Sequence, residues 1–397
     1  MESAASAEFG ECIDVAPAAG HIGALDRGWP QKWPVVDVPV VLDLTDCRFI
    51  ELASLIYLSS RIAQHARRGG AISLRLPRER KVRDFFRDWD FPHTLFDSSG
   101  LRFQEIVASN DRHYFGERRR EIAKTDAWSW YADQSFPSHM FPIQTFFSRS
   151  TEYGRHLAAM QSERWQGPYV LAVLDRYLNG HGKRVATHIV FEAIMNAVRH
   201  PQATLIQFAS HYTPPGRSGV GHLTLVVWDD GKGIVPTLRA ATLAGDLRTS
   251  PDAMLHRQFE TRILRFDGTK SNETVSSKDA PTTTTPNPLL LLSALFPGVT
   301  SLPGRQYGDA HPDVGQDQPA LKEPGMGLFV LLNTAVDVFG GEVAVRTSDL
   351  FMNIKRTDGT ATTDNLPPLQ AKIAESSPNS NFMGNMLTIR LPITATH

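Results

Sequence analysis

Three short motifs follow one another in the C-terminal half of this chain, and their order restricts what that half can fold into. The first is a helix-like stretch, Glu192-Ala-Ile-Met-Asn196-Ala-Val-Arg-His200, with a carboxylate and a carboxamide on one helical face. The second, Asp229-Asp230-Gly231-Lys232-Gly233-Ile234, directly follows an apolar strand-like run. The third, Gly325-Met326-Gly327-Leu328, directly precedes an apolar helix-like run. Because the three can close around one spot, the sequence predicts a nucleotide pocket.

The first motif lies on an amphipathic helix predicted near residues 184–199. Its apolar face can pack against a sheet and comprises Ile189, Val190, Ala193 and Ala197. A polar stripe at i, i+4 spacing comprises His188, Glu192, Asn196 and either Arg199 or His200. Such a stripe alone is usually a solvated helix face, so it is the two glycine motifs that favour a binding site.

The glycine motifs each suit a close approach of the backbone to a ligand. Residues 223–229 form a β-rich run, so Asp229 is expected at the tip of a strand, with Gly231 and Gly233 in the turn after it. The other motif opens the apolar helix predicted over residues 328–338, and a helix N-terminus reached through glycines favours phosphate. An isolated Gly-x-Gly is usually an ordinary turn, and the signal is the order of all three motifs.

These motifs resemble those of the GHKL superfamily of ATP-binding domains, which includes gyrase, bacterial histidine kinases and anti-sigma-factor serine kinases. The resemblance covers residues 181–397 and implies a two-layer α/β sandwich, the Bergerat-type ATP-binding fold. Glu192–His200 resembles the N box of the histidine kinases, with Arg199 in place of lysine. The tail, residues 340–345 and 384–392, resembles the closing hairpin strands, with Asn385 where the family often has threonine.

The resemblance also implies roles for individual residues. Asn196 would ligate Mg²⁺ through its amide oxygen, and Glu192 would orient or deprotonate the attacking water or protein side chain. Asp229 would accept a hydrogen bond from the adenine amino group. The remaining nucleotide-binding residues expected are Gly231 and Gly233 beside the base, and Gly325, Met326, Gly327 and Leu328 at the phosphates. Arg199 and His200 could add charge near the phosphates or could equally be surface residues.

The long interval between the glycine motifs, about residues 235–323, is expected to be a lid that orders over the phosphates when ATP binds. It contains a predicted helix at 252–266, a Ser/Thr/Pro tract ending at residue 288, and a leucine run at 289–296 that could be a partner-binding or a self-packing helix. Candidate phosphate contacts from this interval are Lys270, Arg305 and Lys322.

The N-terminal part predicts a smaller α/β domain. After an arm at residues 1–34, rich in Ala, Gly and Pro, residues 35–100 alternate strand, helix, strand, helix, which implies a parallel pairing. Residues 42–55 resemble the STAS fold of anti-sigma-factor antagonists, whose phosphoacceptor serine begins the following helix. Here the aligned letters are Glu51, Leu52, Ala53 and Ser54, so a docking or scaffolding domain is expected. Residues 101–180 read as a helical linker region.

Bulk composition limits the class of protein. Apolar content of 41% and charged content of 21% are typical of globular domains. The net charge of -1 gives no global attraction to nucleic acid or to membrane, and two cysteines, Cys12 and Cys47, indicate no disulfide framework. The N-terminal residues lack signal-peptide character, and the most apolar run is only about half the length of a membrane span. We therefore expect a cytoplasmic protein.

Three functions remain open from the sequence. The first is an Mg²⁺-dependent regulatory ATPase whose lid closure drives a conformational or partner-binding change. The second is a histidine- or serine-type protein kinase, although His156 lacks the Glu and Pro that usually follow a phosphoacceptor histidine. The third is a non-catalytic scaffold that senses ATP. A protein partner or self-association through the N-terminal domain or the lid is expected in addition to ATP.

Overall fold

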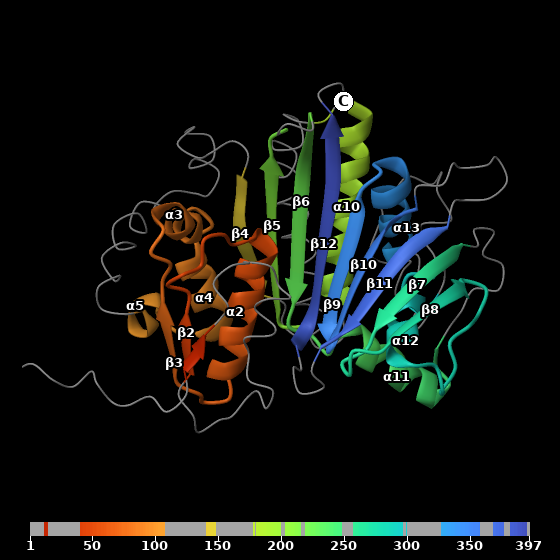
Figure 1. Cartoon of the computed structure of the whole chain (residues 1–397), viewed down its shortest axis with the longest axis horizontal. Coiled ribbons are helices and arrows are strands. Elements are labelled where there is room, and N and C mark those ends of the chain that lie inside the picture. Colours follow the sequence, from red (N-terminus) through yellow and green to blue (C-terminus); the bar gives the residue numbers. More distant parts are fainter. Residues whose placement is uncertain are drawn as a thin grey trace, which may run out of the picture. The chain divides into compact units, whose positions relative to one another are not determined.

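The computed structural model describes residues 12–14, 40–107, 140–147, 178, 180–199, 203–215, 219–247, 257–296, 299, 327–357, 368–376 and 382–394. The chain divides into two compact units, each of mixed α/β structure (Figure 1). Unit 1 comprises Met1–Thr145 and Asn379–Asn381, and unit 2 comprises Phe146–Pro378 and Phe382–His397. Within the described residues, no helix has the length and apolarity needed to cross a membrane.

Unit 1 contains a three-stranded parallel sheet in the order β1 (Cys12–Asp14), β2 (Val40–Asp43), β3 (Ile72–Arg75). Among the described residues of this unit, the helices are α2 (Leu52–Ala66), α3 (Arg80–Asp88), α4 (Phe91–Ser99) and α5 (Phe103–Ile106). The predicted alternation of strand and helix and the parallel pairing of β2 with β3 are therefore confirmed. The arm expected at residues 1–34 is not entirely loose, because β1 lies within it and pairs with β2.

The core of unit 1 forms around α2, which is buried along almost its whole length. Ala53 and Ser54, at the start of this helix, are 5% and 0% exposed. Aromatic side chains of α3, α4 and α5 also pack together. The ring of Phe91 meets those of Phe86 and Phe103 edge-on, with 5.0 and 6.1 Å between ring centroids. Burial of large rings in such edge-to-face contacts is a main source of stability in a small domain.

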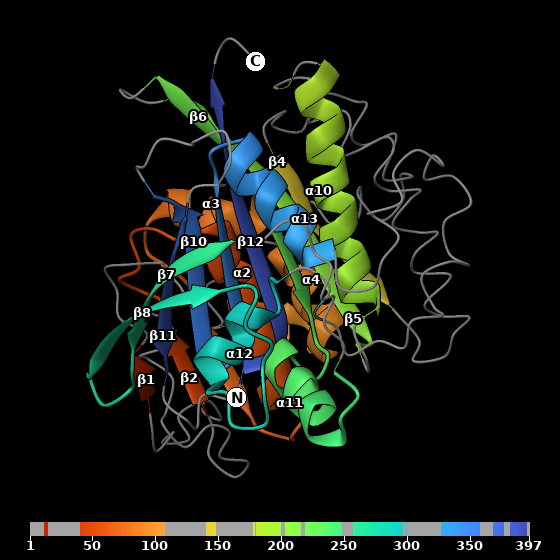
Figure 2. The same cartoon turned by 90° about the vertical axis from the view of Figure 1, so that its right-hand side faces the viewer.

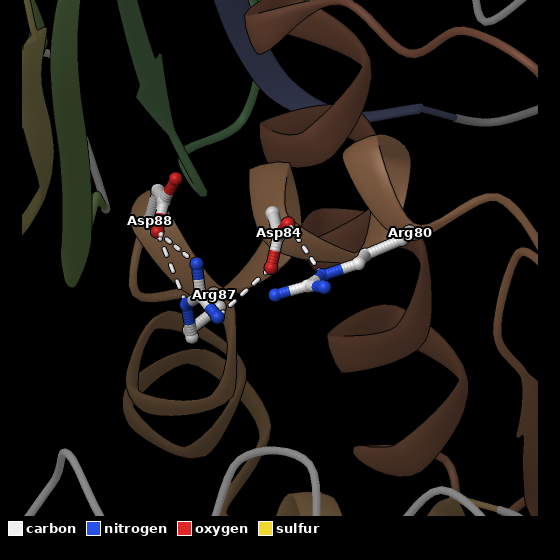
Figure 3. A network of polar contacts seen from close by, with 4 residues as sticks. All are labelled: Arg80, Asp84, Arg87 and Asp88. Carbon is white, nitrogen blue, oxygen red and sulfur yellow. Dashed lines mark hydrogen bonds and ion pairs between the residues drawn. The ribbon is translucent and has the colours of Figure 1, made fainter.

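Charged side chains lie along the surface helices of unit 1. On α3, Arg87 pairs with Asp84 at 2.8 Å and with Asp88 at 3.1 Å, and Arg80 approaches Asp84 at 3.7 Å (Figure 3). Such helix-surface pairs each contribute a few tenths of a kcal/mol, so this network is a local stabilising feature. On α4, the ring of His93 lies 3.5 Å from Asp90 and 3.3 Å from Asp97, and hydrogen bonds to both carboxylates raise the pKa of His93 to about 10.

Unit 2 is built on a mixed sheet. Within this unit the order of the described strands is β5 (Leu205–Thr213), β6 (Val220–Asp229), β12 (Phe382–Thr394), β9 (Glu342–Ser348), β10 (Leu350–Arg356), β11 (Leu369–Glu375), β7 (Gln258–Leu264), β8 (Lys270–Ser276). From β5 to β8 every neighbouring pair is antiparallel except β11 and β7. Alternate residues are buried along most of β10, as expected where helices cover one face.

The helices of unit 2 are α10 (Gly180–Arg199), α11 (Ile234–Ala244), α12 (Asn287–Ser293) and α13 (Gly327–Asn333), which continues as a π-helix at Thr334–Val338. Figure 2 shows α10 and α13 side by side along one face of the sheet. The apolar face predicted for α10 is confirmed, because Ile189, Val190, Ala193 and Ala197 are all buried. The strand predicted before Asp229 and the helix predicted after Gly327 are confirmed as β6 and α13.

Several sequence predictions for unit 2 are wrong in detail. The helix expected at 252–266 is strand over Gln258–Leu264, where β7 and β8 extend the sheet. Within the region expected to be a helical linker, Met140–Phe147 is strand β4. The strands at 342–348 and 382–394 are antiparallel neighbours, but β10 and β11 intervene in sequence, so they form no simple hairpin. Residues 300–323 of the expected lid, with the candidate phosphate contacts Arg305 and Lys322, lie outside the described residues.

Of the two roles predicted for the leucine run, a partner-binding helix or a self-packing helix, the structure supports self-packing. The run forms α12, in which Leu290, Leu291 and Leu292 are fully buried. Phe296, three residues after the helix, stacks on Phe259 of β7 with 5.7 Å between ring centroids. These side chains therefore belong to the core of unit 2, where their burial stabilises the sheet extension.

Candidate functional site

Helix α10 carries the carboxylate and the amide that the sequence singled out. Glu192 is 8% exposed, and Asn196 lies one helical turn further along. Both are carried by a helix that is anchored through Ala193 and Ala197, which are 3% and 4% exposed. A buried carboxylate on a fixed helix is unusual for a solvated polar stripe, since carboxylates are rarely buried without a structural or functional reason.

The first residue of α13 lies directly against these two side chains. A Cβ placed on Gly327 would be 2.8 Å from Glu192 Oε2 and 3.0 Å from Asn196 Oδ1. Residue 327 therefore has to be glycine for the helix start to approach the carboxylate and the amide this closely. Glu192, Asn196 and Gly327, called here the Gly327 cluster, bring two of the three predicted motifs together.

The chemistry of the Gly327 cluster fits a hard cation bound to phosphates. Amide and carboxylate oxygens are the donors that Mg²⁺ prefers, and it is commonly bound by one or two of them together with phosphate oxygens. Among the described residues, nothing accepts a hydrogen bond from the buried Nδ2 atom of Asn196. An orphaned buried donor is costly, and a phosphate oxygen would satisfy it.

The structure describes only some of the remaining residues expected at the phosphates. Leu328 is the second residue of α13, and Arg199 is the last residue of α10. His200, Gly325 and Met326 lie outside the described residues. Lys270 lines a different feature, a groove of about 590 Å³ on the sheet, whose lining includes none of the Gly327 cluster.

A second group of polar side chains forms a row across three adjacent strands. Asp229, at the end of β6, is 3% exposed and lies opposite Asn385 of β12, which in turn lies opposite Thr347 of β9. Residues directly opposite one another on antiparallel strands point to the same face. Asp229, Asn385 and Thr347 are called here the polar row.

Hydrogen bonds connect the polar row to the turn that follows β6. The backbone N–H of Gly231 donates to Asp229 Oδ1 at 2.9 Å, and Asn385 Nδ2 donates to Asp229 Oδ2 at 3.0 Å. The N–H of Ile234, at the start of α11, donates to Asn385 Oδ1 at 2.7 Å and to Thr347 Oγ1 at 3.1 Å. The carboxylate of Asp229 is thus held in one orientation from both sides.

Two glycines allow this close arrangement. Gly233 has φ of 94°, and a Cβ there would be 3.0 Å from Thr347 Oγ1. Gly384 has φ of 79°, and a Cβ there would be 1.6 Å from the carbonyl oxygen of Asp229. Side chains rarely adopt such φ values, and here they would also collide with the backbone of β6 or with the polar row.

The two neighbouring aspartates of the motif have different partners. Asp230 accepts hydrogen bonds from the backbone N–H groups of Thr204 and Leu205 at 2.7 and 2.8 Å, and from the hydroxyl of Thr204 at 2.7 Å. These contacts fix the beginning of β5, so Asp230 acts as a structural residue. Asp229 alone remains as the acidic candidate for contact with a ligand.

Sequence reasoning missed three members of this site. Asn385 was noted only as a departure from the threonine of the resembled family, and Thr347 and Gly384 were not assigned a role. A usable signal was the Gly384-Asn385 pair at the beginning of a β-rich run, since glycine within a strand often marks a close backbone approach. Thr347 offered no such signal in the sequence.

Comparisons with known proteins do not identify this site. No protein-family model, no curated protein and no solved structure gives a significant match to the chain. The case for its function therefore depends on the Gly327 cluster and the polar row.

Proposed function

We propose that this chain is a regulatory protein that binds Mg²⁺–ATP in unit 2 and hydrolyses it. The single observation that carries the proposal is the contact of Gly327 with both Glu192 and Asn196. That contact supports the GHKL resemblance, because in such a site the start of one helix has to meet the polar face of another. The Bergerat-type sandwich for unit 2 and a STAS-like docking role for unit 1 are part of the same proposal.

Each described residue has a definite task in the proposed reaction. Asn196 Oδ1 would hold the cation, which when bound neutralises charge on the phosphates. Glu192 would accept the proton of the attacking water, for which a buried carboxylate within hydrogen-bond reach is suited. The amides at the start of α13 would face the phosphates, and Asp229 would accept from the adenine amino group. Binding would be coupled to a conformational or partner-binding change through the expected lid at about residues 235–323.

The test uses the purified full chain with ATP labelled at the γ-phosphate. Free phosphate, label on protein and bound nucleotide are measured in the same samples. We expect the wild type to bind ATP and release phosphate, and Glu192→Gln to bind ATP with about 100-fold slower release, since general base catalysis contributes at least that much. Glu260→Gln, an exposed carboxylate on β7, is the matched control and should behave as wild type.

The other outcomes are equally informative. Label transferred to protein would favour a histidine- or serine-type kinase over hydrolysis. ATP binding without release or transfer would leave an ATP-sensing scaffold. A folded wild-type protein that binds no ATP in the presence of Mg²⁺ would refute the proposal as a whole.

A further inference from the structure

We propose that the face of the unit 2 sheet opposite α12 is a docking surface for an acidic, amphipathic segment of a partner protein. The proposal goes beyond nucleotide binding, because the groove that carries it is lined by none of the Gly327 cluster and none of the polar row. It gives the protein partner expected from the sequence a surface and a chemistry.

The alternation of side chains along the strands divides the sheet into two faces. On one face, the ring of Phe259 in β7 stacks on Phe296, which follows α12. The side chains at the alternate positions of β7, and those opposite them on β11 and β10, point to the other face, called here the open face. Three cationic side chains on the open face are exposed: Arg262, Lys355 and Lys372.

A groove of about 590 Å³ lies in the open face. Its lining includes four cationic side chains and one carboxylate: Arg262, Lys270, Lys355, Lys372 and Glu342. A second hollow shares Glu342 and Lys355 with the groove and adds Arg356 and Arg390. Among the described residues, Glu342 forms its ion pair with Arg390 at 3.6 Å, so the four cations of the groove have no carboxylate partner. The groove therefore attracts anionic groups, although the whole chain has a net charge of -1.

The strand registers arrange the lining side chains in two lines across the sheet. The first line is polar and crosses β10, β11 and β7 at Asn353, Lys372 and Arg262. The second is apolar and crosses the same strands two residues away, at Phe351, Ala374 and Leu264. Leu264 is 40% exposed and lies opposite Lys270 of β8. A polar, mainly cationic line and an apolar line thus run side by side, about 7 Å apart.

Two such lines fit a protein segment that has acidic and apolar side chains in adjoining stripes. An amphipathic helix presents stripes of this kind, and about 16 residues of helix would span the roughly 24 Å from β12 to β8. Single-stranded nucleic acid fits less well, because its bases stack on successive aromatic rings. The apolar line has one ring, that of Phe351, beside two aliphatic side chains.

The test measures the binding of fluorescein-labelled synthetic peptides to the full chain by fluorescence anisotropy. The probe peptide has leucines in one helical stripe and glutamates in the adjoining stripe, and a second peptide has the same composition in scrambled order. We expect wild type to prefer the probe peptide and to bind it more weakly as salt is added, because salt screens exposed charges. Binding should weaken by about tenfold or more in Arg262→Glu/Lys372→Glu, where two attractions become two repulsions. In Leu264→Ala it should weaken by about fivefold, through the loss of apolar contact.

The controls distinguish a docking surface from a general effect of charge. Lys278→Glu makes the same change at an exposed lysine outside the groove lining and should bind the probe peptide as wild type does, and thermal unfolding of each variant verifies its fold. Equal binding of the probe peptide by wild type and Arg262→Glu/Lys372→Glu, or of the ordered and scrambled peptides by wild type, would overturn the proposal. Tighter binding of oligothymidylate than of the probe peptide would overturn it in favour of nucleic acid. No nucleotide is present in these measurements, so a failure of the proposed function would leave this inference intact.

Discussion

Replacing Gly327 with alanine is the sharpest test of the Gly327 cluster, because the structure predicts a loss of function with little loss of stability. The new Cβ would lie 2.8 Å from Glu192 Oε2, whereas ordinary contact begins at 3.4 Å. The carboxylate therefore has to retreat by roughly half an ångström, which the end of a flexible side chain can do. Overpacking costs about 1–3 kcal/mol, and alanine in a helix regains about 1 kcal/mol relative to glycine. The free energy of unfolding should thus fall by no more than about 2 kcal/mol.

Under the proposed function the effect on ATP turnover should be larger, because the reaction would depend on the position of the Glu192 carboxylate. A misplacement of about 1 Å can cost roughly 100-fold in rate, so a shift of half that size is expected to slow phosphate release by about tenfold or more. Turnover and urea unfolding are measured on the same preparations. Gly180→Ala is the matched control, since it also lies at a helix start and a Cβ there meets nothing within 4 Å. If the alanines at positions 327 and 180 gave the same turnover, the reasoning would be refuted.

Two further predictions concern stability. Gly384→Ala should lower the free energy of unfolding by about 3 kcal/mol or more, because its Cβ would overlap the backbone of Asp229. Gly268→Ala, which has a similar φ and open space around the Cβ, should lower it by only about 1–2 kcal/mol. Equal losses of the two variants in urea unfolding would contradict this. Hydrogen bonds to Asp90 and Asp97 raise the pKa of His93 to about 10. Its contribution to the free energy of unfolding is therefore fully present below the ordinary value of 6.5 and is lost as pH rises through 10. The difference in unfolding free energy between wild type and His93→Gln should therefore shrink from pH 6 to pH 10.5, and a constant difference would show that the ion pairs contribute nothing.

Periodicity and motif order were enough to predict the elements that hold the site. The apolar spacing of α10, the β-rich run before Asp229 and the apolar run after Gly327 each bury one continuous face in the structure. These segments are long or strongly patterned, so local sequence and tertiary packing agree. The same holds for β2, α2 and β3 in unit 1, whose order and parallel pairing followed from the alternation of patterns.

The parts that could not be predicted depend on contacts between distant strands. The sequence predicts a helix over 252–266, whereas Gln258–Leu264 alternates buried and exposed residues as a strand does. This strand pairs with β8 through a local turn and, in parallel, with β11, more than a hundred residues later in the chain. Asn385 and Thr347 likewise meet Asp229 only through the strand order of the sheet, which local sequence does not encode.

Hydrogen bonds connect the polar row to α11, the helix that begins the interval between the two glycine motifs. The first N–H of α11, that of Ile234, is held by the polar row. Further along this helix, Arg239 donates to the carbonyl oxygens of Thr283 and Thr285 at 2.8 and 2.5 Å, and to Asn287 at the start of α12 at 2.8 Å. The Thr/Pro tract, which composition alone assigns to a mobile lid, is thereby tied to the helix that begins at the polar row. A change at the polar row can therefore reach α12 through α11 and a single arginine.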